Sequence, residues 1–237
     1  MPVKSVTIIK EGTICIEAFE KPKSGILAVK EFCGVGSGST VTYVESDVKI
    51  IVDTGFDFEN VQDMGNVERN RRNLIFALSS FGLKPEDIDV VFITHWHCDH
   101  FGNLDVFNHS KILASDGVAK NRGFDCKGVR DGEEIADGVS VIYTPGHTKD
   151  HASLLLEVLG RSKSIIAVAG DAVVSPSYYI LNKVWNYNGD FYSMEAALES
   201  MRKIKEVSDY IIPGHGNIFK NSEKKESENK QTKNIKI

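Results

Sequence analysis

The chain has 237 residues, of which 41% are hydrophobic and 26% are charged, and its formal net charge is -5. This composition is typical of a soluble globular protein, and the length is sufficient for one large domain with a substantial core. The acidic balance argues against general nucleic-acid binding, which needs a basic surface, and no apolar run approaches the roughly 20 residues that cross a bilayer.

Short alternating segments dominate the first 53 residues and begin with MPVKSVTIIKEG. This start lacks the apolar core and small-residue cleavage site of a secretory signal, so we expect a cytoplasmic protein. Residues 3–10, 13–19, 26–32, 39–45 and 48–55 read as strands, which predicts an antiparallel meander. None of the four cysteines forms a C-x-x-C pair, which excludes zinc-ribbon and thioredoxin-type motifs.

Helices and strands alternate in the rest of the chain, which favours a layered α/β architecture. Apolar residues at helical spacing predict helices over 66–81, with Gly82 as a stop, and over 194–207, with Ser193 as N-cap. Further strands are expected at 90–94, 111–115, 139–145, 152–159 and 164–171, followed by YII at 210–212, whereas the glycine-rich stretch 125–138 reads as turns. We expect one domain over residues 1–220 and a polar, disordered or frayed tail over residues 221–237.

The segment ITHWHCDHFGN, residues 93–103, holds three of the chain's seven histidines within six positions. In an extended segment His95 and His97 point the same way, because successive side chains alternate. A turn after them would bring Asp99 and His100 to a second position nearby. Imidazole and carboxylate are good metal ligands, and metal sites are often built where strands end in loops. One short loop therefore offers ligands for two metals, which explains the spacing better than a chance group of histidines.

Three further candidates each follow a predicted strand: His147 in YTPGHTKDH, Asp171 in IIAVAGDA and His215 in YIIPGHG. Taken alone, an aspartate after a buried strand is as often a turn former or a helix cap, but the other matches favour a ligand. His151 is expected to be an exposed loop histidine, with support of a ligand as the alternative. His109 is expected at the surface.

The order and type of these residues resemble the metallo-β-lactamase superfamily. Its H-x-H-x-D-H signature corresponds to His95, His97, Asp99 and His100, followed by His147, Asp171 and His215, and the likeness extends from IIVDTG through PGHG. The fold that the resemblance implies is an αββα sandwich, an α/β (α+β) fold with its metal site at one edge of two packed sheets.

Carried over position by position, the resemblance implies two groups of metal ligands. The first consists of His95, His97 and His147, and the second consists of Asp99, His100 and His215. Asp171 would bridge both metals, and Asp53 of the DTG segment would support a ligand. The implied cofactors are two divalent metal ions; zinc is expected, and iron or manganese also suits these ligands.

The reaction that the resemblance implies is hydrolysis of an ester, lactone, thioester or phosphoester bond in a small molecule. Hydrolytic metal pairs lie about 3.5–4 Å apart, and a bridging hydroxide together with Asp171 would offset their repulsion. Asp99 is the expected catalytic residue, which orients the nucleophile or carries a proton. Lactonases of the superfamily have a tyrosine three residues after the bridging aspartate, where this chain has Val174, so the substrate stays unassigned.

Aromatic side chains near these motifs are the candidate substrate contacts, namely Phe56, Tyr178, Tyr179 and Trp185. A pocket wall, a dimer contact and core packing all remain open for them. We expect a small-molecule substrate, no membrane partner and no nucleic acid, and a homodimer is compatible with the sequence.

Two other classes of function fit the same resemblance. A mononuclear iron dioxygenase acting on a thiol or persulfide would use only two histidines and the bridging aspartate. A small single-domain nuclease stays open as well, and the acidic net charge disfavours it only mildly, because a local basic patch escapes a whole-chain count. A silent binding protein is disfavoured because the ligand set is complete.

Overall fold

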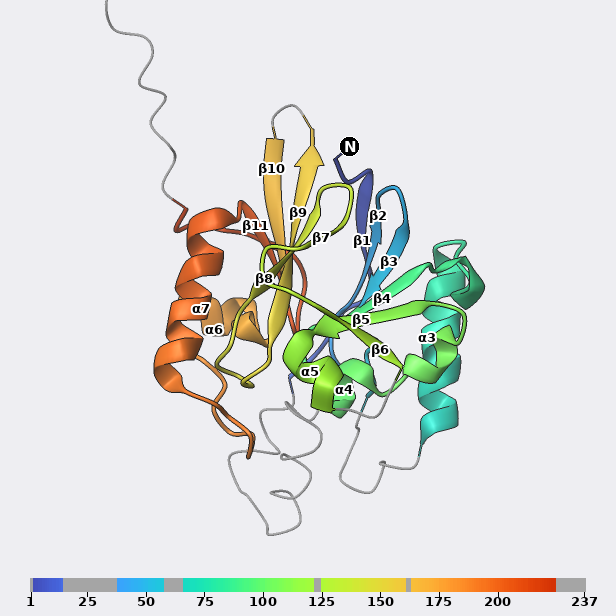
Figure 1. Cartoon of the computed structure of the whole chain (residues 1–237), viewed down its shortest axis with the longest axis horizontal. Helices are drawn as coiled ribbons and strands as arrows, with labels where there is room; N and C mark the ends of the chain where they lie inside the picture. Colours follow the sequence, from blue (N-terminus) through green and yellow to red (C-terminus); the bar gives the residue numbers. More distant parts are fainter. Residues whose placement is uncertain (1, 15–37, 58–65, 122–124, 161–162, 225–237) are drawn as a thin grey trace, which may run out of the picture.

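The structure is a computed structural model that describes residues 2–14, 38–57, 66–121, 125–160 and 163–224. Within these ranges, two six-stranded sheets pack face to face (Figure 1). Helix α3 (Val67–Ser80) lies on the outer side of the first sheet, and α6 (Pro176–Ile180) and α7 (Met194–Val207) lie on the outer side of the second. The layer order helix, sheet, sheet, helix is the one predicted.

The first sheet changes from antiparallel to parallel along its strand order. Its strands are β1 (Ser5–Lys10), β2 (Val41–Glu45), β3 (Lys49–Val52), β4 (Val90–Ile93), β5 (Lys111–Ser115) and β6 (Cys126–Val129). β1, β2 and β3 form the antiparallel part, as the sequence predicts for this region, whereas β3 to β6 run parallel. The carboxyl ends of β3 and β4 therefore lie at the same edge of the sheet.

The second sheet is mostly antiparallel. Its strands, in chain order, are β7 (Glu134–Ala136), β8 (Val139–Tyr143), β9 (Ala152–Leu159), β10 (Lys163–Gly170), β11 (Tyr210–Pro213) and β12 (Phe219–Lys220). β10 and β11 pair in parallel, so the loops that follow them also leave from one edge.

Successive side chains of each strand point to opposite faces of its sheet, and this alternation builds three separate apolar layers. In β4, Val90 and Phe92 face the second sheet and join the central core, whereas Val91 and Ile93 face the layer that contains Leu74 of α3. On the other side, Ala167 and Ile211 pack against Met201 and Ile204 of α7, while Val168 and Ile212 face the central core. These layers hold the two sheets together and fix the edge where their loops meet.

The two long helices begin as their sequences predict. The Asn66 side chain accepts a hydrogen bond from Arg69 N at 3.2 Å at the start of α3, and Ser193 accepts one from Ala196 N at 3.2 Å at the start of α7. The shorter helices are η2 (Pro85–Asp87), α4 (Cys98–Phe101), η3 (Leu104–Phe107), α5 (Asp116–Asn121) and η4 (Asp171–Val173).

The structure differs from the sequence prediction at two places. Residues 125–138, expected as turns, contain the strands β6 and β7. Both are short strands at the ends of their sheets, so hydrogen bonding to one neighbour holds them without a clear apolar pattern. The packed body also passes the expected boundary at 220, because the Asn221 amide is buried and donates to Lys205 O and Ser208 O at 2.7 Å each.

Some predictions fall outside the described residues. These are the expected strand at 26–32, most of the one at 13–19, and the tail over residues 225–237. Among the helices that the structure describes, none is long and apolar enough to cross a membrane.

Candidate metal centre

The seven predicted ligands meet at one edge of the sandwich. They follow the carboxyl ends of strands from both sheets: β4 leads to the four residues of the H-x-H-x-D-H signature, β8 to His147, β10 to Asp171 and β11 to His215. α4, which carries the last two signature residues, lies at the lower side of the molecule in Figure 1. All seven side chains are buried, with relative exposures of 0–3%.

The first group consists of His95, His97 and His147, whose ligand atoms lie within 4.8 Å of one another. Nδ1 of His97 lies 2.9 Å from Nε2 of His95 and 3.0 Å from Nε2 of His147. Three imidazole nitrogens therefore point toward one position.

The second group consists of Asp99, His100 and His215, also within 4.8 Å. Nε2 of His215 lies 3.5 Å from Oδ2 of Asp99, and Nε2 of His100 lies 3.9 Å from the same oxygen. α4 begins after His97 and carries Asp99 and His100, and the ring of His100 lies 4.1 Å from that of His95 between ring centroids, so the two groups adjoin.

Asp171 lies between the two groups with one oxygen toward each. Its Oδ2 is 3.2 Å from His147 Nε2 and 4.0 Å from His95 Nε2. Its Oδ1 is 3.4 Å from Nε2 of both His100 and His215. A single carboxylate thus connects the two candidate sites.

Outer hydrogen bonds decide which nitrogen of each ring faces inward. The Thr94 hydroxyl and the His100 Nδ1–H both donate to Oδ2 of Asp53, at 2.9 and 2.7 Å. Thr94 Oγ1 then accepts from Nδ1–H of His95 at 3.1 Å, and the Thr13 carbonyl accepts from Nδ1–H of His215 at 2.8 Å. Nδ1 of each of the three rings is thereby engaged, so Nε2 is the atom that each ring presents to the centre, as in metal-bound histidines. Although burial of the His100 ring opposes its charged form, the carboxylates of Asp53 and Asp171 raise the pKa of His100, so a metal at its Nε2 would displace a proton.

The centre has the chemistry of a cation site. Within the described part of the chain, both carboxylate oxygens of Asp171 and Nε2 of His100 and His215 are buried without a hydrogen-bond partner. Leaving a polar group in that state costs about 1–3 kcal/mol. Histidine nitrogens and carboxylates around such a position fit divalent metal ions, which would satisfy these atoms together.

Three of the candidate ligands have the protonation state that metal binding requires. Burial lowers the pKa of His147 to about 3 and that of His95 well below its usual value, so both rings are neutral near pH 7. Burial opposes ionisation of Asp171, but His215 and His100 beside it hold the pKa of its carboxyl well below the usual range. Asp171 therefore stays negatively charged in this buried position.

Comparisons with known proteins agree with this geometry. Residues 33–122 match the family model described as the metallo-beta-lactamase superfamily. Metallo-beta-lactamase domain-containing protein 1 of Xenopus laevis is 30% identical over 232 residues, covering 93% of this chain and 86% of that protein. The chain belongs to the metallo-β-lactamase superfamily.

Two further members of the superfamily resemble the chain. An N-acyl homoserine lactonase of Bacillus cereus is 29% identical over 147 residues, covering 56% of each protein. A solved N-acyl homoserine lactone hydrolase, with N-hexanoyl-L-homoserine at its catalytic metal centre, has a TM-score of 0.64 and 21% identity, covering 91% of this chain and 94% of that one. The αββα fold is thereby confirmed, and the chain is a metallo-hydrolase of this fold.

The prediction that His151 is an exposed loop residue is wrong. His151 is 1% exposed, and its ring stacks on that of His95 with centroids 4.9 Å apart. Its Nε2 accepts the backbone N–H of Asp171 at 3.1 Å, and its Nδ1 lies 2.8 Å from Thr144 Oγ1. The spacing of four residues from His147 pointed to the alternative, a supporting role, but the contact with Asp171 depends on the pairing of β9 with β10.

We expect metal affinity to depend on the hydrogen-bond acceptor Nε2 of His151 more than on the size of its side chain. In His151→Asn the shorter amide reaches only Thr144, so the buried N–H of Asp171 loses its partner and metal affinity falls about 10–100-fold. In His151→Gln the longer amide places an oxygen near the position of Nε2 and retains most of the affinity. Titration of metal-loaded protein with a competing chelator measures the difference, and His109→Ala, at the exposed His109, is the control. Equal affinities for the Asn variant and the wild type would contradict this role.

Most of the aromatic candidates are packed in the interior. Phe56, Tyr179 and Trp185 are each 2% exposed. Tyr179 belongs to the layer under α7 and donates to Asn221 Oδ1 at 2.5 Å, while Trp185 packs on Val174. These three side chains therefore pack in the core, which was one of the roles left open for them. Tyr178 is half-buried.

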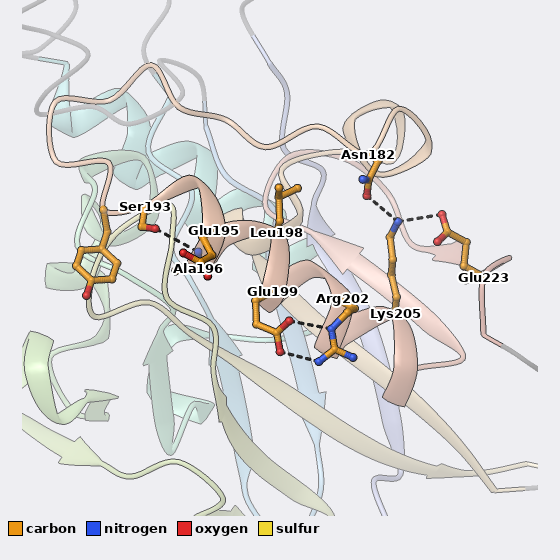
Figure 2. Close-up of a pocket in the computed structure, with 10 residues that line it drawn as sticks. Asn182, Ser193, Glu195, Ala196, Leu198, Glu199, Arg202, Lys205 and Glu223 are labelled. Carbon is orange, nitrogen blue, oxygen red and sulfur yellow. Dashed lines mark hydrogen bonds and ion pairs between the residues drawn. The ribbon is translucent and has the colours of Figure 1, made fainter.

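A groove along α7 lies apart from the ligands. Figure 2 shows its charged side chains paired with one another: Arg202 with Glu199 at 2.6 and 2.8 Å, and Lys205 with Glu223 at 2.9 Å and with Asn182 at 3.1 Å. The groove has a volume of about 800 Å³, but none of the seven predicted ligands lines it. It therefore does not replace the histidine centre as the candidate active site.

Thr94 and two residues of a distant loop contact the centre but escaped sequence analysis. Asp190 Oδ1 lies 2.9 Å from Nε2 of His97, and Asn188 Nδ2 donates to the carbonyl of His147 at 2.9 Å. Both lie in the loop between α6 and α7, where no strand end or motif marks them.

Proposed function

We propose that the chain is a hydrolase that uses two divalent metal ions, with zinc as the expected metal. The observation that carries this proposal is the position of Asp171, whose two oxygens face two separate groups of ligands at 3.2–4.0 Å. His95, His97 and His147 would hold the first ion, and Asp99, His100 and His215 the second. A single buried carboxylate with one free oxygen toward each group is suited to bridging.

Bound there, the two ions would lower the pKa of a shared water to supply the nucleophile and would stabilise negative charge on the substrate. Asp99 is the residue that we expect to accept and return the proton of this water. Its carboxyl is fully buried at the second group, 3.5 Å from Nε2 of His215, beside the position where the water would be bound. Without metal, burial raises the pKa of this carboxyl to about 6. Asp171 supplies fixed negative charge rather than proton transfer.

The substrate class that we propose is a small molecule with an ester, lactone, thioester or phosphoester bond. The similarity to an N-acyl homoserine lactonase makes lactones the first group to test. Val174 occupies the position three residues after Asp171, is 2% exposed and packs on Trp185, so it offers no hydroxyl to a lactone. Other esters and thioesters therefore belong in the same panel.

Metal removal tests the proposal directly. We expect freshly purified protein to contain two metal ions per chain by elemental analysis. Dialysis against a chelator should abolish hydrolysis of the best substrate in the panel, and addition of Zn²⁺ or Mn²⁺ should restore it. Full hydrolytic activity after complete metal removal would contradict the proposal.

Elemental analysis also distinguishes the proposed hydrolase from the alternative, a mononuclear iron dioxygenase. That enzyme would hold one iron per chain and consume oxygen with a thiol or persulfide substrate. The second group argues for a hydrolase, because His100 and His215 each have an outer acceptor that directs Nε2 toward Asp171.

A further inference from the structure

The loop between α6 and α7 holds one half of the metal centre. Asn188 is buried, and its amide donates twice: to the carbonyl of His147 at 2.9 Å and to Oδ1 of Asp190 at 2.8 Å. The same Oδ1 accepts the Nε2–H of His97 at 2.9 Å. Two loop residues thereby join two histidines that are 50 positions apart in the chain.

These contacts fix the orientation of His97. A carboxylate oxygen only accepts hydrogen bonds when ionised, so the proton of the neutral ring must lie on Nε2, and Nδ1 presents its lone pair to His95 and His147. Without Asp190 the ring is free to take the other tautomer, which places an N–H where the metal needs a lone pair. Asn188 in turn holds the carboxylate in place.

The contacts are confined to the first group. Among the described residues, the side-chain hydrogen bonds of Asn188 and Asp190 reach His97 and His147, and none reaches Asp99, His100 or His215. The second group has other supports, because Asp53 accepts from His100 at 2.7 Å and the Thr13 carbonyl accepts from His215 at 2.8 Å. Asp53 also reaches the first group through Thr94 and His95, whereas Asn188 and Asp190 reach the first group alone.

We propose that Asn188 and Asp190 are positioning residues that set the metal affinity of the first site separately from the second. This inference rests on the proposed two-metal function. Asp53 is shared between the sites, because it contacts His100 directly and His95 through Thr94. Loss of the Asn188 and Asp190 contacts should therefore weaken the first metal while the second stays bound.

The experiment is a stepwise chelator titration of the full chain loaded with Co²⁺, followed by absorption and elemental analysis. In Asp190→Ala and Asn188→Ala we expect one of the two ions to bind about 10–100-fold more weakly and the other to stay within twofold of the wild type. Asp190→Asn should recover part of the loss, because its amide oxygen still accepts from His97. Asp125→Ala removes an exposed carboxylate of the same type and should change neither ion.

The identity of the weakened ion is read by comparison with ligand variants. Asp190→Ala should weaken the ion that His147→Ala loses and should spare the ion that His215→Ala loses. Equal weakening of both ions by Asp190→Ala, or weakening of the ion that His215→Ala loses, would overturn the inference. A wild-type chain that binds fewer than two ions would instead overturn the proposed two-metal function. If Asp190→Ala does not fold, Asn188→Ala and Asp190→Asn decide by the same readout.

Discussion

Asp171→Ala is expected to lose both metal ions and to lower kcat by more than about 100-fold, beyond the usual effect of removing an outer partner of a ligand. The side chain is 3% exposed, and its two oxygens face histidines of both groups. The variant leaves the six other proposed ligands in place but removes the negative charge that offsets two neighbouring cations. Elemental analysis and steady-state kinetics with the best substrate measure the two effects.

The control for this variant is Asp125→Ala, which removes the same charge from an exposed position. It should keep two ions per chain and wild-type kcat. If Asp171→Ala keeps both ions and full activity, the bridging role is wrong. If it loses only one ion, Asp171 belongs to a single site.

Gly214→Ala is the second variant for which we expect a large effect. A Cβ at this position would lie 1.9 Å from Oδ1 of Asp171 and 2.9 Å from the backbone carbon of Gly170. The backbone cannot easily yield, because Gly214 N donates to Gly170 O at 2.9 Å and to Val173 O at 3.1 Å. The carboxylate must therefore rotate away from its position between the two ligand groups, and we expect metal affinity and kcat each to fall by more than about 10-fold.

A matched glycine variant separates this effect from simple destabilisation. Gly82 follows Phe81, the C-cap of α3, with a φ of +72°, and a Cβ there meets nothing within 4 Å. Gly82→Ala strains the backbone by about 1–2 kcal/mol, and overpacking at Gly214 costs a similar amount, about 1–3 kcal/mol. Urea unfolding of the metal-free proteins should therefore show comparable losses, while only Gly214→Ala loses metal and activity. Equal functional losses in the two variants would contradict the steric argument.

The sequence predicted the elements whose signals are local. α3 and α7 carry apolar residues at helical spacing, and the predicted N-cap Ser193 caps α7 without help from distant residues, as Asn66 does for α3. The four signature residues occupy six positions, so the geometry of one extended segment and one turn separates them into two groups. The order of the candidate ligands along the chain resembles that of the metallo-β-lactamase superfamily and so indicated the family.

The partners of these residues could not be predicted, because they come from distant parts of the chain. Asp190 is 93 positions from His97, and no periodicity or motif connects them. The same holds for Tyr179 and Trp185, whose burial depends on the packing of α6 and the following loop rather than on their neighbours in sequence.

The candidate ligands, their order and their places after strand ends could be read from the chain alone, since they follow from the alternation of side chains and from residue chemistry. The contacts of His151 with the backbone of Asp171 and of Asp190 with His97, and the pairing of β6 and β7, became known only from the folded chain. Hydrogen bonds across sheets and between loops depend on how the two sheets pack, and the separate segments carry no trace of that packing.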